Sequence, residues 1–244
     1  RSAKMSPHVC RLYKGQYAHL NTNYTMDRFY MGEHAIHGIM YDADFIVQAS
    51  EANEDQASVI LVNHYLGSDQ GYPFPFTMHV KWILEKNNKV SVQTTIQNNA
   101  TVPIPIVDGW HPYFTLGESI NNCTLQFSSK GKMEYDKDLL PTGNMIADAR
   151  FSNGLKIGDL QLDDGYELSA ENSSCTLQNE QFILNIMPSS QYPYLQLYIP
   201  PDRNSIAIEN LSGAPNALNN KMGLHVVKPQ NNIVFDTSYQ VVVK

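Results

Sequence analysis

The chain has 244 residues, of which 42% are hydrophobic and 17% charged, and its formal net charge is −7. This composition is typical of a folded globular protein and excludes an intrinsically disordered chain. The acidic balance and the scattered lysines also disfavour a nucleic-acid partner, because binding to phosphates requires clustered Lys and Arg.

The cysteines and the hydropathy pattern exclude further classes. The cysteines Cys10, Cys123 and Cys175 show no CxxC spacing, so we expect structural thiols in a reducing compartment and no metal site. The chain contains no run of 18 apolar residues, so we expect no membrane partner. We expect a cytoplasmic protein. The abrupt start at Arg1 leaves a periplasmic or secreted location open.

Alternation of apolar and polar residues predicts the first clear strands. In residues 76–84 every second residue is apolar, namely Phe76, Met78, Val80, Trp82 and Leu84. This pattern is typical of a half-buried strand. A polar turn at residues 86–89 follows, and alternation resumes over residues 90–96. The two segments therefore predict an antiparallel β-hairpin.

The rest of the chain shows the same short strand patterns. Further strands are predicted at residues 124–127, 182–187, 195–199, 205–209, 233–235 and 240–243. Gly, Pro, Asn, Asp and Ser clusters separate them, and no long pattern with a helical period is present. We therefore expect an all-β protein, an antiparallel β-sandwich with little helix, formed by residues 1–244 as a single domain.

Three histidines and one glutamate are candidates for chemistry. His37, His111 and His225 each lie in an apolar setting, where a single histidine is more often structural than catalytic. Pro112 favours an extended backbone at His111, so its ring can be presented in a fixed direction. Glu209 ends a predicted strand in which Ile206 and Ile208 alternate away from it. The Gly/Pro/Asn-rich residues 210–219 that follow are typical of a loop at the rim of a cleft.

Other residues could complete a sugar site. Asp163 and Asp164 precede Gly165, a pattern that indicates a turn first and a ligand contact second. Aromatic rings cover the apolar faces of sugars, and the segment Trp110, Tyr113 and Phe114 together with residues 72–76 could supply them.

In combination these motifs resemble the aldose 1-epimerase (galactose mutarotase) family, whose members are all-β supersandwiches. The matching segments are His37-Gly38, GYPFPF at residues 71–76, HPYF at 111–114, LLPTG at 139–143 and IENLSGAPNALN at 208–219. The resemblance extends from about residue 7 to the end of the chain. One or two strands that the family has before Cys10 are expected to be missing.

The resemblance implies roles for individual residues. His111 takes the place of the general acid and Glu209 that of the general base, while the implied sugar-binding residues are Arg11, His37, Asp163, Phe114 and Asn216. Asp163 matches the family's aspartate best, and Asp164 remains an alternative. Cys10 stands where many members have Asn, and Asn210 stands where Pro is usual. No cofactor is implied.

The expected function is interconversion of the α and β anomers of a free hexose such as glucose or galactose. The expected partner is therefore a small-molecule sugar, bound by a monomer or a weak homodimer. Three alternatives remain open: an epimerase of hexose 6-phosphates, a non-catalytic sugar-binding or sensing protein, and a sandwich domain of a polysaccharide lyase or hydrolase. A 6-phosphate would require cations near the site, for which Arg11, Arg203 and Lys221 are candidates.

Overall fold

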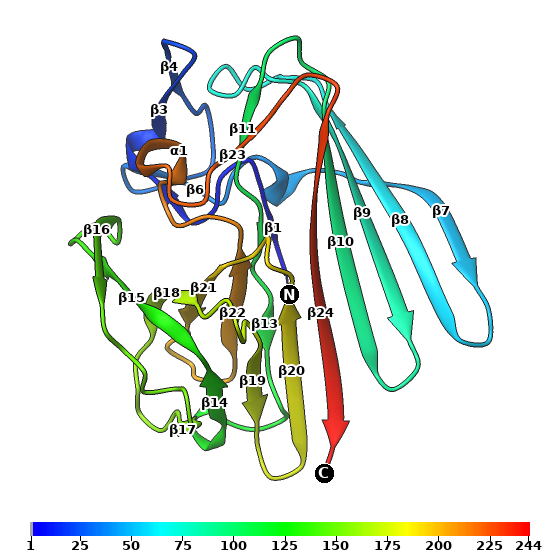
Figure 1. The fold of residues 1–244 in the computed structure, drawn as a ribbon, viewed down its shortest axis with the longest axis vertical. Coiled ribbons are helices and arrows are strands. Elements are labelled where there is room, and N and C mark those ends of the chain that lie inside the picture. Colours follow the sequence, from blue (N-terminus) through cyan, green and yellow to red (C-terminus); the bar gives the residue numbers. More distant parts are fainter. Residues whose placement is uncertain (1) are drawn as a thin grey trace.

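The computed structural model describes residues 2–244 and confirms the all-β, antiparallel architecture. Two large sheets make up most of the molecule, and three small sheets lie near the end at which β3 and β4 are labelled in Figure 1. The only α-helix among the described residues is α1 (Ala217–Asn220), and the three 3₁₀ turns are Tyr13–Gly15, Met40–Asp42 and Ile120–Asn122. None of these helices is long and apolar enough for a membrane crossing.

The first large sheet has eight strands and carries most of the candidate site residues. Its order is β1 (Lys4–Met5), β12 (Gly109–Trp110), β22 (Ile206–Leu211), β21 (Tyr194–Tyr198), β18 (Asp163–Leu168), β15 (Ser129–Tyr135) and β16 (Pro141–Ile146), and β13 (Tyr113–Phe114) also pairs with β22.

The second large sheet has nine strands, and part of it fans out on the right of Figure 1. Its order is β17 (Leu155–Lys156), β14 (Thr124–Phe127), β19 (Cys175–Gln178), β20 (Phe182–Pro188), β24 (Asn232–Val243), β10 (Lys89–Asn98), β9 (Phe76–Glu85), β8 (Gln56–Tyr65) and β7 (Ile46–Ala52).

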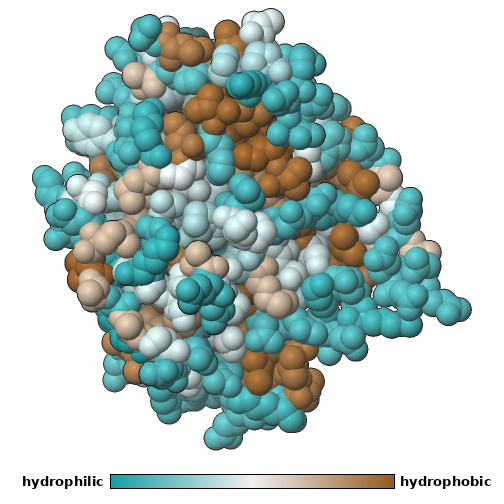
Figure 2. Space-filling view, viewed as in Figure 1, coloured by the Kyte–Doolittle hydropathy of each residue, from teal (hydrophilic) through white to brown (hydrophobic). Residues whose placement is uncertain are grey.

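The small sheets consist of strands of two to four residues. They are formed by β2 (Arg11–Leu12), β6 (His34–Ile36) and β5 (Tyr30–Met31), by β3 (Gln16–His19) and β4 (Thr22–Thr25), and by β11 (Ile104–Ile106) and β23 (His225–Val227). On the face seen in Figure 2, apolar side chains gather in the region where Figure 1 labels β11 and β23. Hydrophilic side chains cover most of the outline of this face. Strands this short show no alternation, which is why the sequence did not predict them.

The predicted hairpin and the strands at residues 124–127 and 182–187 are present, and one prediction needs correction. Residues 233–235 and 240–243 belong to a single strand, β24, because residues 236–239 pair with β10 and with β20. The polar residue Thr237 takes a position on the apolar face of the strand and interrupts the apolar alternation without ending the strand. Backbone hydrogen bonds to a neighbour on each side hold this central strand together.

Two apolar clusters form the core. One lies between the large sheets and contains Leu125 and Leu177 from the second sheet and Leu195, Ile206 and Ile208 from the first. The other combines residues of the small sheets, such as Leu12 and Ile104, with residues of the second large sheet, such as Met78 and Ile96. The face of β21 and β22 that does not enter the first cluster is therefore available to the site.

The alternating face of β9 is buried along only part of its length. Met78 is 0% exposed and Val80 is 2% exposed, whereas Leu84 is 56% exposed. The sequence pattern predicted all of these positions as buried. The end of β9 extends beyond the core, so no other element covers Leu84.

Met78→Ala and Leu84→Ala should therefore differ although both remove a large apolar side chain from the same face of β9. Replacement of the buried Met78 should lower the unfolding free energy by about 2–5 kcal/mol because it leaves a cavity. Replacement of the exposed Leu84 should lower it by less than about 1 kcal/mol. Urea denaturation of the two variants measures the difference, and equal losses would contradict the described packing.

Candidate active site

The pairing of two short strands with β22 places His111 level with Glu209. Gly109 of β12 pairs with Leu211, and Tyr113 of β13 pairs with Ala207, so the residue midway between them lies opposite Glu209. His111 Nε2 is 3.2 Å from Glu209 Oε1, and Glu209 is 2% exposed. The HPYF segment thus brings an imidazole and a carboxyl group into direct contact.

The same row continues across the sheet. Gln196 of β21 pairs with Glu209, and Gly165 of β18 pairs with Gln196. Gln196 Nε2 donates a hydrogen bond of 2.9 Å to Asp163 Oδ1, and Tyr135 Oη donates one of 2.8 Å to Gln196 Oε1. A Cβ at residue 165 would collide with the Tyr135 hydroxyl, so glycine is needed for this network.

Residues of the small sheet β2-β6-β5 close the site from the opposite side. The cavity measures about 360 Å³, within the range of small-molecule sites. It is lined by Cys10, Arg11, Met31, Ile36, His37, His111, Tyr113, Asp163, Gln196, Tyr198 and Glu209.

His37 reaches the cavity through a tight backbone arrangement. Its φ is 64°, and its N–H donates a hydrogen bond of 2.9 Å to the Cys10 carbonyl. The next residue, Gly38, has a φ of 72° and lies so close to the Ser6 backbone that a Cβ would collide with it. The His-Gly pair therefore has a structural reason for its glycine. The rings of His37 and His111 meet edge to face with centroids 5.1 Å apart.

Strand β1 fixes the backbone that carries His111. Lys4 pairs with Trp110, and the His111 N–H donates a hydrogen bond of 3.0 Å to the Ala3 carbonyl. Lys4 is buried, donates to the Asp108 carboxylate, and its ammonium lies 4.4 Å from the centre of the Trp110 ring. A buried ion pair held by additional contacts orders the strand from which His111 projects.

Burial moves the pKa values of the central pair in opposite directions. Removal from water lowers the pKa of His111 to about 4, and it raises the pKa of Glu209 well above its usual range, with a further rise from the charge of nearby Asp163. Burial also raises the pKa of Asp163, although nearby Arg11 opposes that rise. The pair therefore favours a single shared proton over two charges.

The remaining sequence candidates lie in different places. Asp163 lines the cavity, whereas the Asp164 carboxylate points to Lys132 Nζ, 3.1 Å away. The structure thus separates the two aspartates that the sequence left as alternatives. Arg11 lines the cavity, and Cys10 donates a weak hydrogen bond of 3.9 Å to Glu209 Oε2.

Two predicted sugar contacts are placed outside this cavity. The Phe114 ring packs against Tyr239 at a centroid distance of 5.6 Å, because the alternation along β13 turns Phe114 toward the core and Tyr113 toward the cavity. Asn216 instead contacts the backbone beside Arg11: its N–H donates to the Arg11 carbonyl at 2.8 Å, and its Oδ1 accepts from the Tyr13 N–H at 3.1 Å.

The sequence did not lead us to predict Gln196 and Tyr198 as site residues, although the alternation pattern of their strand could have indicated them. In residues 194–198 the leucines alternate with Tyr194, Gln196 and Tyr198, so the polar face of that strand could have been assigned to the site. Met31 lies in a two-residue strand and had no such signal. No cluster of three or more His, Cys, Asp or Glu residues with the geometry of a metal site occurs within residues 2–244.

Comparisons with known proteins give a family match and a curated relative. A family model described as aldose 1-epimerase matches residues 3–240. The uncharacterized protein YihR of Escherichia coli is 26% identical over 221 residues, which cover 88% of this chain and 68% of that protein.

Solved structures resemble the fold closely at low sequence identity. A galactose mutarotase-like protein of Clostridium acetobutylicum superimposes with a TM-score of 0.89 at 18% identity, covering 100% of this chain and 79% of the other. A galactose 1-epimerase of Lactobacillus acidophilus gives 0.83 at 17% identity, covering 98% and 79%. These likenesses establish a galactose mutarotase-like fold.

The buried histidines around the site predict the pH dependence of stability. Burial lowers the pKa of His8 to about 4 and that of His37 to about 3, from 6.5. At pH values between these pKa values and 6.5, the unfolded chain binds more protons than the folded chain. The unfolding free energy should therefore fall as the pH is lowered from 6.5 toward 4, and His8 should contribute on the order of 3 kcal/mol to that fall. In urea denaturation at several pH values, His8→Gln should show a shallower dependence, with His79→Gln as control; an unchanged slope would refute the assignment.

Proposed function

Because the chain belongs to the aldose 1-epimerase family, we propose that it interconverts the α and β anomers of a free hexose by acid–base opening and closure of the ring. The observation that carries this proposal is the contact of His111 Nε2 with Glu209 Oε1 at 3.2 Å in the wall of a cavity of about 360 Å³. Mutarotation requires an acid and a base on two oxygens that share one carbon atom, so the two groups must lie close together.

Ring opening uses the two groups at once. The Glu209 carboxylate takes the proton of the anomeric hydroxyl while the His111 imidazolium protonates the ring oxygen. The bond between C1 and the ring oxygen breaks, and C1 becomes the carbonyl carbon of the open aldehyde. After rotation about C1–C2, neutral His111 takes the proton from the attacking hydroxyl, and protonated Glu209 returns its proton to the carbonyl oxygen.

The directions of the pKa shifts suit these tasks. A raised pKa makes the Glu209 carboxylate a stronger base, and a lowered pKa makes the His111 imidazolium a stronger acid. The reactive form is the Glu209 carboxylate beside the His111 imidazolium, and it exists when the single proton shared by the two groups resides on His111. Sugar hydroxyls that donate to Glu209 favour that arrangement because they stabilise the carboxylate.

The other cavity residues supply groups for the sugar hydroxyls. Arg11 lies on the small sheet and His37 directly follows it, whereas Asp163 lies on the large sheet, so a ring between the sheets can be held from two sides. The buried His37 Nδ1 has no protein partner within residues 2–244 and is free to bind a hydroxyl.

A free hexose fits the cavity charge better than a 6-phosphate. Arg11 is the only Lys or Arg among the described residues that line it. Arg203 instead donates to the Gly158 carbonyl at 2.7 Å, and Lys221 donates to the Leu218 carbonyl at 2.6 Å. The cations considered for a phosphate group therefore do not converge. A non-catalytic sugar binder would not use the acid–base pair, and rate measurements distinguish it.

Removal of either catalytic group should abolish most of the acceleration. Glu209→Gln and His111→Asn should each lower kcat/KM by about 10²–10⁴-fold, because each positioned acid or base contributes a factor of that size. Polarimetry on freshly dissolved α-glucose and α-galactose, corrected for the spontaneous rate, measures the effect. A loss under about tenfold for His111→Asn would assign that histidine to packing alone.

Matched controls are available outside the site. Glu51→Gln on β7 and His79→Asn on β9 make the same chemical changes far along the second sheet and should retain wild-type rates. Circular dichroism and thermal unfolding establish that all four variants are folded.

The pH profile of kcat/KM should be bell-shaped with an acid limb near pH 4. Below the pKa of His111, about 4, both groups are protonated and the base is lost. Above the raised pKa of Glu209 both are deprotonated and the acid is lost. Stopped-flow polarimetry across pH should give a plateau between the two limbs, and a rate that rises continuously with pH would contradict a shared proton.

A further inference from the structure

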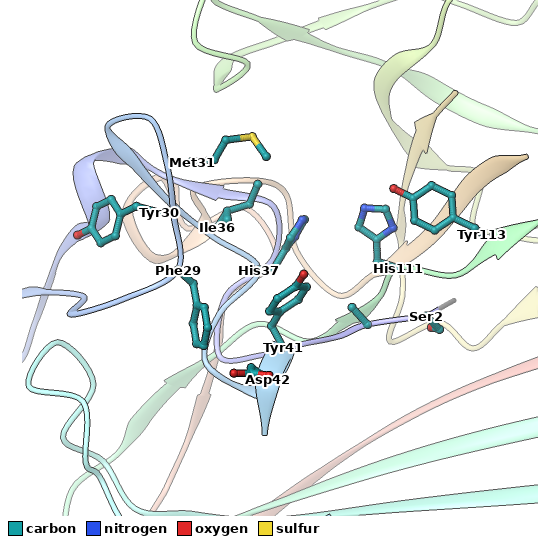
Figure 3. A pocket seen from close by; sticks show the side chains of 11 residues that line it. Ser2, Phe29, Tyr30, Met31, Ile36, His37, Tyr41, Asp42, His111 and Tyr113 are labelled. Atoms are coloured by element: carbon teal, nitrogen blue, oxygen red, sulfur yellow. The ribbon is translucent and has the colours of Figure 1, made fainter. Parts of the chain in front are cut away.

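A cavity between the β3–β4 hairpin and the segment around α1, here called the hairpin cavity, plays no part in the mechanism described above. It measures about 450 Å³, and Figure 1 labels α1 beside β3. The pocket drawn in Figure 3 adjoins the catalytic cavity and shares His37 and His111 with it. The hairpin cavity shares no described lining residue with either of these spaces. Its lining residues include Tyr13, Gln16, Asn23, Tyr24, Asn216 and Asn219.

Tyrosine rings supply the apolar surface of the hairpin cavity. The rings of Tyr17 and Tyr24 stack with centroids 5.3 Å apart, and both residues line the cavity. Tyr17 is buried, and its hydroxyl donates a hydrogen bond of 2.7 Å to the Gly71 carbonyl, so this pair is held in place from below. Tyr13 also lines the cavity and is 42% exposed. The cavity therefore presents fixed aromatic rings to a ligand that arrives from solvent.

Hydrogen bonds to the backbone fix the orientation of two amide side chains in the cavity. Asn216 must present its Oδ1 to the Tyr13 N–H, 3.1 Å away, because that backbone group can only donate. Asn219 must present its Nδ2 to the Gln16 carbonyl, 2.8 Å away, and the same Nδ2 donates to Asn216 Oδ1 at 2.7 Å. Both N–H bonds of Asn219 are thereby used. Within residues 2–244, Asn216 Nδ2 remains as a free donor and Asn219 Oδ1 as a free acceptor.

The lining chemistry identifies the kind of ligand. The described residues that line the cavity include no Asp, Glu, Lys, Arg or His. The Lys14 ammonium lies 5.4 Å from the Tyr13 ring centre, but Lys14 does not line the cavity. A fixed donor next to a fixed acceptor matches two adjacent hydroxyl groups, each of which can both donate and accept. Aromatic rings cover the apolar C–H face of a sugar. A neutral, hydroxyl-rich ring therefore suits the cavity better than a charged ligand.

We propose that the hairpin cavity is a second saccharide-binding site, which holds a neutral sugar ring and performs no chemistry on it. The described lining residues include no imidazole and no carboxyl group that could serve as acid or base near neutral pH. The site uses none of the residues assigned to mutarotation, so it does not rest on the proposed function. A ligand that binds here leaves the catalytic cavity open to a separate sugar.

Titration of the wild-type protein with unreactive sugars, followed by NMR of its backbone amides, tests the proposal. The methyl glycosides of glucose, galactose, mannose and xylose have no free hydroxyl at C1, so the outcome does not depend on mutarotase activity. At least one should shift the amide signals of Ala18 and Asn23 with a dissociation constant in the millimolar range. Asn216 is a poor reporter because its N–H donates to the Arg11 carbonyl. No shift at Ala18 and Asn23 up to about 100 mM of any glycoside, or tighter binding of glucose 6-phosphate there, would overturn the proposal.

Two variants assign the binding to this cavity, and an exposed asparagine elsewhere supplies the control. Asn219→Ala removes the free acceptor and one of the bonds that orient Asn216, and it should weaken binding by about threefold to tenfold. Tyr13→Ala removes an exposed ring and should weaken binding by a similar factor. Asn153→Ala, in the turn before β17, should keep the wild-type dissociation constant. Wild-type affinity in both cavity variants would place the sugar elsewhere and refute the assignment.

Discussion

The pairing register around β22 is the constraint on which the site depends. Two short strands, β12 and β13, share one edge of β22 and leave His111 between them, level with Glu209. On the other edge β21 brings Gln196 level with the same carboxyl group. Because successive side chains of a strand alternate between faces, a slip of one residue in either pairing would turn Glu209 or its partner into the core. Ordinary backbone hydrogen bonds therefore set the distance between acid and base.

Burial then gives this geometry its chemical character. The same packing that hides Ile206 and Ile208 in the core withdraws Glu209 from water on the opposite face. Loss of hydration disfavours the charged forms of Glu209 and His111, and their contact lets one proton serve both. The surrounding network holds this unfavourable arrangement in place, from Lys4 and Asp108 behind His111 to Tyr135 beside Gln196.

The small sheet β2-β6-β5 forms one wall of the catalytic cavity. It carries Arg11 to that cavity, and its strand β5 ends with Met31, which also lines it. The left-handed residues Phe29 and His37 lie on either side of β5 and β6 in the chain. Other left-handed residues, such as Asn87 and Asn88, lie in turns, whereas His37 directs its ring into the cavity. A short, irregular sheet can adopt such conformations because few ladder hydrogen bonds fix its backbone.

The sequence by itself determined the fold class, several of the strands and the candidate residues at the centre of the site, but it did not predict the ten-residue strand β8. Period-two alternation predicts strands such as β9 and β14 because the core selects apolar side chains on one face. The motifs containing His37, His111 and Glu209 were recognisable without coordinates. Only the tertiary structure decided between Asp163 and Asp164, turned Phe114 away from the cavity and brought in Gln196. Those outcomes depend on strand register and on which face of each strand is covered, and both are set by residues far apart in the chain.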